Sequence, residues 1–394
     1  MLLIAIIIMD LLAGVEFDLF VTSFPELQSH FQLSPFWVEA LLSTNFIGYC
    51  TSLFFVGGLA DRYGRKPILL LGLATFILGS SLCLLTASYP ALLFGRFLQG
   101  VGIASPAILS FLIIADSFPL KKQQFYLAML NGIMNSSVAI APVIGSYITL
   151  YFHWQGNFTA LFLLGVVSLI MTALFVPSQL PPGHKEPFSL RGYIPILQAK
   201  PLMLLIMSLV VMFVPYWIFV GISPILYMEH LGVSLAHFGY YQGALALAFA
   251  LGSVLYGLII NRYDQKKMLI LSCGIFAISL LAIACVAFVD SKNPLIITCS
   301  LLLFVIGQII PSTILYPVIL NVMPQAKGQI TALIQGGRLI LSSLGLQLAA
   351  LCYVGSFQNI GIIIALFILL TTISQYFVIK SESISLAPCN KTLC

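Results

Sequence analysis

Twelve separate apolar stretches fill almost all of the 394 residues, and each is long enough to cross a lipid bilayer. About 20 apolar residues span the hydrocarbon core as an α-helix. The stretches form two sets of six, offset by 200 positions. The offset is marked by residues that recur between helices two and three of each set: Gly57, Asp61, Arg62, Tyr63 and Lys66 return as Gly257, Asn261, Arg262, Tyr263 and Lys266. Such an internal duplication is typical of transporters whose substrate site lies between the repeats.

The pattern predicts an all-α membrane protein with 12 transmembrane helices in two pseudo-symmetric, six-helix halves. The predicted spans are 2–25, 37–60, 67–87, 89–115, 122–150, 157–176, 201–227, 236–261, 267–289, 294–320, 328–352 and 358–379. The expected domains are an amino-terminal bundle (1–176), a cytoplasmic linker (177–200), a carboxy-terminal bundle (201–379) and a cytoplasmic tail (380–394).

Composition supports this class. The chain is 60% hydrophobic and only 7% charged, whereas soluble domains carry about 25% charged residues. Most side chains must therefore face lipid or neighbouring helices, and the loops are too short to form a nucleic-acid patch. The eight cysteines form no CxxC motif and have no nearby histidine, so neither a metal site, another cofactor nor a disulfide framework is expected.

The basic residues predict the orientation. Of 17 lysines and arginines, 14 fall on one side of the predicted membrane, and Lys292 falls on the other. Both termini and the linker are therefore expected in the cytoplasm. Short loops favour a bacterial inner membrane. The 14 residues are Arg62, Arg65, Lys66, Lys121, Lys122, Lys185, Arg191, Lys200, Arg262, Lys266, Lys267, Lys327, Lys380 and Lys391.

The loop between helices two and three reads Gly57-Gly58-Leu59-Ala60-Asp61-Arg62-Tyr63-Gly64-Arg65-Lys66. It resembles the G-x-L-a-D-r-x-G-r-k signature of the major facilitator superfamily. We interpret it as a gating latch. Gly57 and Gly64 would allow close helix approach and a tight turn, Asp61 would face a helix amino terminus, and Arg65 would pair with Asp116. Alternatively, these charges only fix the topology.

Further motifs narrow the resemblance. Arg96-Phe97-Leu98-Gln99-Gly100 in helix four is similar to a superfamily element, and Pro142 and Gly145 in helix five match an antiporter motif in which Ala141 replaces the usual glycine. Asp18 to Pro25 resembles the helix-one motif of the Bcr/CflA-type drug:proton antiporters, with Thr22 in place of proline. The resemblance implies proton-coupled efflux of small amphiphilic compounds.

Charged residues inside membrane spans are costly, so they usually face a cavity and usually function. At 100° per residue in one continuous helix, Asp10 and Asp18 share a face, and Glu16 lies about 200° away from Asp18. Asp18 and Arg96 have matching depths, so we predict that they pair, with Asp18 as the proton carrier and Asp10 as the second candidate. A purely structural ion pair is the alternative, and Glu16 receives no role.

The expected substrate cavity is mixed in character. Arg338 lies near mid-membrane in helix 11, where it would bind a substrate carboxylate, an internal acid or a cytoplasmic gate. The other substrate candidates are polar or aromatic residues of helices two, five, seven and eight: Asn45, Tyr49, Asn131, Asn135, Trp217, Tyr241 and Gln242.

Three rival functions follow from these residues. Arg338 favours an exporter, or even an importer, of an anionic metabolite such as a siderophore. A second rival is a membrane sensor or scaffold that has lost transport. An enzyme is not expected, because the sequence has neither a nucleotide-binding loop nor a Ser-His-Asp constellation. The expected partners are a small-molecule substrate, protons and membrane lipid, and the expected state is a monomer.

Overall fold

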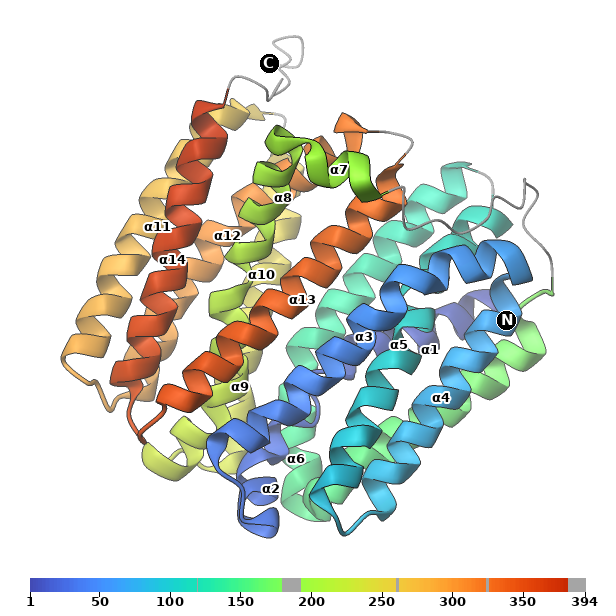
Figure 1. The fold of residues 1–394 in the computed structure, drawn as a ribbon, viewed down its shortest axis with the longest axis horizontal. Coiled ribbons are helices and arrows are strands. Elements are labelled where there is room, and N and C mark those ends of the chain that lie inside the picture. The colour runs from blue at the N-terminus through green and yellow to red at the C-terminus, as the bar shows by residue number, and fades with distance from the viewer. Residues whose placement is uncertain (119, 179–192, 260–261, 324–325, 382–394) are drawn as a thin grey trace. The chain divides into compact units, whose positions relative to one another are not determined.

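The computed structural model describes residues 1–118, 120–178, 193–259, 262–323 and 326–381 (Figure 1). Within these ranges all regular elements are helices and no strand occurs, which confirms the all-α class. The elements are α1 (Leu2–Val15), η1 (Val21–Ser23), α2 (Phe24–Phe31), α3 (Pro35–Tyr63), α4 (Arg65–Leu85), α5 (Tyr89–Ser117), α6 (Leu120–Phe175), α7 (Ile194–Gln198), α8 (Lys200–Met212), α9 (Val214–Pro224), η3 (Ile225–His230), α10 (Leu235–Ile259), α11 (Gln265–Phe288), α12 (Pro294–Val322), α13 (Lys327–Cys352) and α14 (Phe357–Lys380).

Nine helices in the described part of the chain are long and apolar enough to cross a membrane. One of them, Gly132–Phe175, runs for 44 residues and contains parts of two predicted spans. These are separated by a kink at His153, whose backbone φ is 59°. The predicted first span contains the shorter apolar helix α1, and the predicted eleventh span matches α13, whose polar residues include Arg338.

The predicted continuous helix over 2–25 is wrong, because α1 ends at Val15 and the chain turns before it becomes helical again at Val21. The Thr22 hydroxyl donates to the Leu19 carbonyl at 3.0 Å, and Pro25 supplies no backbone N–H to a preceding turn. The hydroxyl offers the Leu19 carbonyl an alternative to the helical hydrogen bond, and Pro25 leaves the Val21 carbonyl without the donor of a continuing α-helix. Side-chain directions counted at 100° per residue therefore do not hold beyond Val15.

The predicted span 201–227 is likewise interrupted. Helix α8 ends at Met212 and α9 begins at Val214, immediately before Pro215. After Pro224 the chain continues as the π-helical turn η3. Proline cannot donate the backbone hydrogen bond that would continue the preceding turn, which explains why both interruptions lie beside a proline.

The chain divides into two compact units. Unit 1 comprises Met1–Ser189 with Val233–Gly243, and unit 2 comprises Leu190–Gly232 with Ala244–Cys394. In unit 1, glycines bring the helices into close contact: Gly48 of α3 lies against Phe97 of α5, and Gly100 of α5 lies against the Asn45 carbonyl of α3. Small residues at helix contacts are the usual means of packing membrane helices. Helix α5 also packs against α1.

Candidate functional site

A buried ion pair lies at the centre of unit 1. The Nη1 of Arg96 on α5 is 3.0 Å from the Oε1 of Glu16, which caps α1, and both side chains are 0% exposed. The Phe20 ring lies 3.7 Å from the Arg96 guanidinium carbon and covers one of its faces. An arginine in this setting is held by a carboxylate and by an aromatic ring at once.

Hydrogen bonds extend this pair to two further helices, α3 and α4. Asn45 of α3 donates to Glu16 Oε1 at 2.8 Å and to the Arg96 carbonyl at 3.1 Å. Arg96 donates to Gln99 Oε1 at 2.6 Å, and Gln99 donates to the Ser80 hydroxyl of α4 at 2.8 Å. The network therefore joins the end of α1 to α3, α4 and α5.

The predicted ion pair between Asp18 and Arg96 is wrong, because Glu16 occupies that position. The physical reason is the interruption of helix one after Val15, which changes the direction in which Glu16 and Asp18 point. Asp18 is 1% exposed, and within the described part of the chain its Oδ1 has no hydrogen-bond partner. Asp18 is thus a buried carboxyl group beside a network whose arginine is already paired.

Two other buried carboxyl groups lie in unit 1. Asp10 on α1 and Glu39 on α3 are both 0% exposed, and neither carboxyl group has a hydrogen-bond partner among the described residues. Asp10 was a sequence candidate. Glu39 was missed, because an acidic residue in the first turns of a predicted membrane helix is usually read as lying at the membrane surface.

The antiporter-motif residues Pro142 and Gly145 lie on α6, and Gly145 packs directly against the interruption that follows α1. A Cβ at Gly145 would collide with the Leu19 carbonyl, so only glycine fits there. Nearby, Asn157 donates to the hydroxyls of Ser23 and Thr149, at 2.8 Å in both cases. The carbonyl of Pro142, the other motif residue, lies against Gly239 of α10, which belongs to the same unit.

The loop motif shows the predicted pairing of Arg65 with Asp116. The Nε of Arg65 lies 3.0 Å from Asp116 Oδ2, joining the start of α4 to the end of α5. Lys66 donates to the Ala173 carbonyl of α6 at 2.7 Å, and Gly64 adopts φ 95°, which favours glycine at this turn.

The other loop-motif residues have different outcomes. A Cβ at Gly57 would meet no described atom within 4 Å, so the close approach predicted there is not seen. Arg62 lies 5.2 Å from the centre of the Tyr63 ring. The side chain of Asp61 lies outside the described residues, as do those of Asn131 and Asn135, so their predicted roles stay predictions.

The remaining cavity candidates lie on aromatic or buried surfaces. In unit 1, Tyr49 packs edge-on against Phe17 at 5.8 Å, and Gln242 is fully buried. Beside Tyr241, the Tyr240 hydroxyl forms a 3.0 Å hydrogen bond with Tyr147 of α6. In unit 2, Trp217 is 7% exposed. These positions are compatible with aromatic walls, and their contact with a substrate stays a prediction.

Arg338 of α13 stacks on an aromatic ring. Its guanidinium carbon lies 4.6 Å from the centre of the Phe213 ring, at the interruption between α8 and α9. Such a cation–π contact stabilises an arginine away from bulk water. It ties α13 to the interrupted seventh helix within unit 2.

Comparisons with known proteins identify the family. The family model described as Major Facilitator Superfamily matches residues 6–346. Multidrug resistance protein MdtL of Vibrio parahaemolyticus is 29% identical over 294 residues, which is 72% of each chain. MdtL of Salmonella heidelberg is 26% identical over 267 residues, or 67% of each chain.

Solved structures are similar over nearly the whole chain. A bacterial homolog of the human lysosomal transporter Spinster, inward-facing and occupied, gives a TM-score of 0.77 at 14% identity and covers 96% of both chains. The D-xylose-proton symporter gives a TM-score of 0.76 at 14% identity, covering 99% of this chain and 98% of that one. At this level of identity, the similarity shows a shared fold.

Proposed function

Because the chain belongs to the major facilitator superfamily, we propose that it is a secondary active transporter that exports small amphiphilic compounds in exchange for protons. The relatives named multidrug resistance protein support this substrate class. The observation that carries the coupling is the buried Asp18 carboxyl group beside the Glu16–Arg96 pair.

In this proposal Asp18 is the proton carrier. Glu16 already neutralises Arg96, so Asp18 lies in a dry interior without an ion-pair partner among the described residues. A carboxyl group in such a place binds a proton when it is shielded from water and releases it when water or a cationic group arrives. Proton and substrate would then compete for the cavity of unit 1. Asp10, which lies within α1, would be a second proton site.

For a neutral substrate, the membrane potential supplies part of the driving force. One elementary charge moving through 100 mV releases about 2.3 kcal/mol, which is enough for roughly a 50-fold substrate gradient before any pH difference is added. Exchange of one proton for a singly charged cation moves no net charge, so the pH difference alone drives it. Export of an anionic metabolite on the same scaffold is the weaker alternative. The Arg338 guanidinium that suggested it already stacks on Phe213, and the named relatives are multidrug proteins.

Further parts of the proposal concern the arrangement of the chain. We place both termini and the linker 177–200 in the cytoplasm, with one six-helix bundle on each side of the linker, and we expect a monomer. The Arg65–Asp116 pair would act as a cytoplasmic latch. Membrane-impermeant labelling of single cysteines added at either terminus tests the topology, since reaction in intact cells would contradict it.

The coupling is tested by proton release on drug binding. Purified protein in weakly buffered detergent is mixed with a cationic drug near neutral pH. We expect the unaltered protein to release a proton, and Asp18→Asn to bind the drug without releasing one. Asp264→Asn is the matched control, since Asp264 caps α11 and asparagine caps a helix equally well. Proton release by Asp18→Asn equal to that of the unaltered protein would remove Asp18 from the mechanism.

A further inference from the structure

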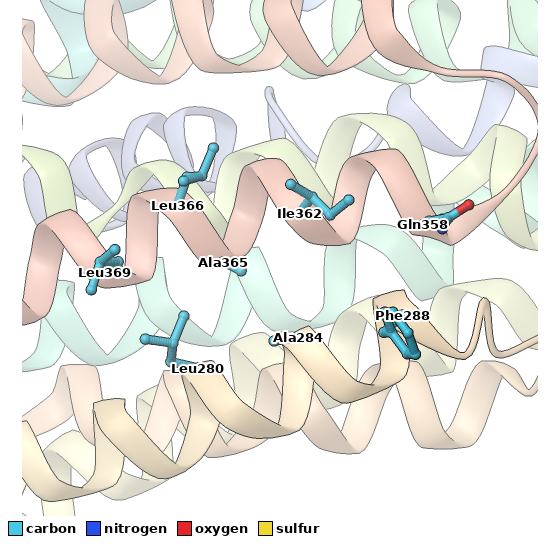
Figure 2. Close-up of a pocket in the computed structure, with 8 residues that line it drawn as sticks. All are labelled: Leu280, Ala284, Phe288, Gln358, Ile362, Ala365, Leu366 and Leu369. Atoms are coloured by element: carbon cyan, nitrogen blue, oxygen red, sulfur yellow. The ribbon is translucent and has the colours of Figure 1, made fainter.

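Unit 2 contains an apolar groove outside the candidate transport site. Helices α11 and α14 lie side by side (Figure 1), and the groove runs between them with a volume of about 260 Å³ (Figure 2). Two small residues, Ala284 and Ala365, form its middle, and Leu280 and Leu369 close one end. Phe288 and Gln358 lie at the other end, where Gln358 is the polar residue of the lining.

The surroundings of this groove identify what fills it. Both helices are long and apolar enough to span the membrane, and Phe288 is 86% exposed. Side chains exposed on a membrane-spanning helix face hydrocarbon rather than water. These surroundings favour a bilayer component as the occupant, and a narrow apolar channel between two helices fits an acyl chain.

One end of the groove, its mouth, carries a carboxylate, and a lysine follows it two residues later in the chain. Asp290 follows α11 directly, and its Oδ1 accepts a hydrogen bond of 3.2 Å from the backbone N–H of Gln358, in the first turn of α14. This bond holds a carboxylate at the end of the groove. Lys292 lies two residues further on, and its side chain is exposed.

We propose that this groove is a binding site for a phospholipid with a primary-amine headgroup. The acyl chain lies between Ala284 and Ala365, the ammonium group donates to Asp290, and the phosphate pairs with Lys292. A carboxylate at the mouth disfavours a headgroup with negative charge alone, and a quaternary ammonium group has no N–H to donate. The site is independent of the proposed substrate and of proton coupling.

Native mass spectrometry tests this site on the full chain. The protein is released from nanodiscs containing equal amounts of phosphatidylethanolamine, phosphatidylglycerol and phosphatidylcholine, and bound lipid is counted. We expect the unaltered protein to retain phosphatidylethanolamine over the other two. Ala284→Leu and Ala365→Leu, which fill the groove, should each lower lipid retention roughly tenfold, because methylene groups of the acyl chain lose their contact with the protein.

Matched variants separate the acyl chain from the headgroup. Cys285→Leu is the control, because Cys285 is also exposed on α11 but does not line the groove; it should retain lipid normally. Asp290→Asn and Lys292→Gln should keep lipid but lose the headgroup preference, and Lys292→Arg should restore it.

Three outcomes would overturn the proposal. One is equal retention of all three lipids by the unaltered protein. Another is retention that neither alanine variant lowers. The third is a protein dimer that Ala284→Leu abolishes, since this would assign the groove to a second copy of the chain.

Discussion

At the scale of single residues, Arg96 organises the polar interior of unit 1. Its guanidinium is fully buried and is held by Glu16, Gln99 and the Phe20 ring. A buried ion pair adds little net stability relative to an apolar pair, but removal of one partner strands the other charge in a medium that solvates it poorly. We therefore propose that the pair acts as a fixed framework, which would leave Asp18 available for proton exchange.

Removal of one partner from this framework should be costly. We expect Glu16→Gln to destabilise the folded protein by roughly 3–5 kcal/mol, because Arg96 would remain charged and buried. The double variant Glu16→Gln with Arg96→Met should be more stable than Glu16→Gln alone. Thermal unfolding in detergent measures both.

A hydrogen bond between Glu26 and the His153 imidazole provides the control. Glu26 contacts His153 at 2.8 Å, but the His153 side chain is largely exposed, so Glu26→Gln should change stability by less than about 1 kcal/mol. Equal losses for Glu16→Gln and Glu26→Gln would mean that the buried pair has no special role.

Sequence reasoning placed correctly the residues whose positions follow from a motif or from a span boundary. Arg65 pairs with Asp116 because both lie at helix ends that a motif and a span boundary define. Glu16 was not assigned to Arg96, because its direction depends on where helix one is interrupted, and nothing in the sequence fixes the angle of the chain after Val15. Glu39 was missed because its burial depends on tertiary packing around α3.

At the scale of elements, the interruption of the first membrane helix, after α1, is held in place by α6. Gly145 of α6 allows the backbone of α6 to reach the Leu19 carbonyl, and the Asn157 amide bonds the Ser23 hydroxyl. The sequence predicted the all-α class and the glycine motif. It did not predict the interruption, because the hydrogen bonds that stabilise it come from side chains more than 100 residues away.

Substitution of one glycine in this contact should be disruptive. We expect Gly145→Ala to destabilise the protein by roughly 1–3 kcal/mol, because its Cβ would collide with the Leu19 carbonyl and force α6 away. Gly132→Ala on the same helix is the control. A Cβ there meets no described atom within 4 Å, so this change should be neutral or stabilising by up to about 1 kcal/mol. Thermal unfolding of the two variants compares them, and equal stability would contradict the packing described.

The Arg65–Asp116 latch should matter more for motion than for stability. Asp116 is 39% exposed, and pairs of this kind contribute about 0–1 kcal/mol. We expect Arg65→Gln to leave the unfolding temperature nearly unchanged and to lower the transport rate several-fold. Arg65→Lys should restore transport only partly, since lysine lacks the planar guanidinium. An unchanged transport rate in Arg65→Gln would make the pair a topology signal alone.

At the scale of the whole molecule, the chain is a member of a transporter superfamily whose fold supports many cargoes. Fold and repeat were readable from the sequence because bilayer thickness dictates helix length and apolar content. The transported substrate could not be predicted from the sequence. The cavity residues are scattered over many helices, and short motifs do not determine the shape of the cavity that these residues form together. We propose that the buried carboxyl groups of unit 1 carry the proton coupling.

Substrate-induced proton movement in inverted membrane vesicles tests proton-coupled export most directly. The vesicle interior is acidified, and cationic drugs, neutral drugs and polycarboxylates are added in turn. We predict proton release when a cationic or neutral drug is added, and no release from vesicles carrying Asp18→Asn. A response to polycarboxylates alone, lost in Arg338→Gln, would contradict multidrug export and make the protein a carrier of anionic metabolites.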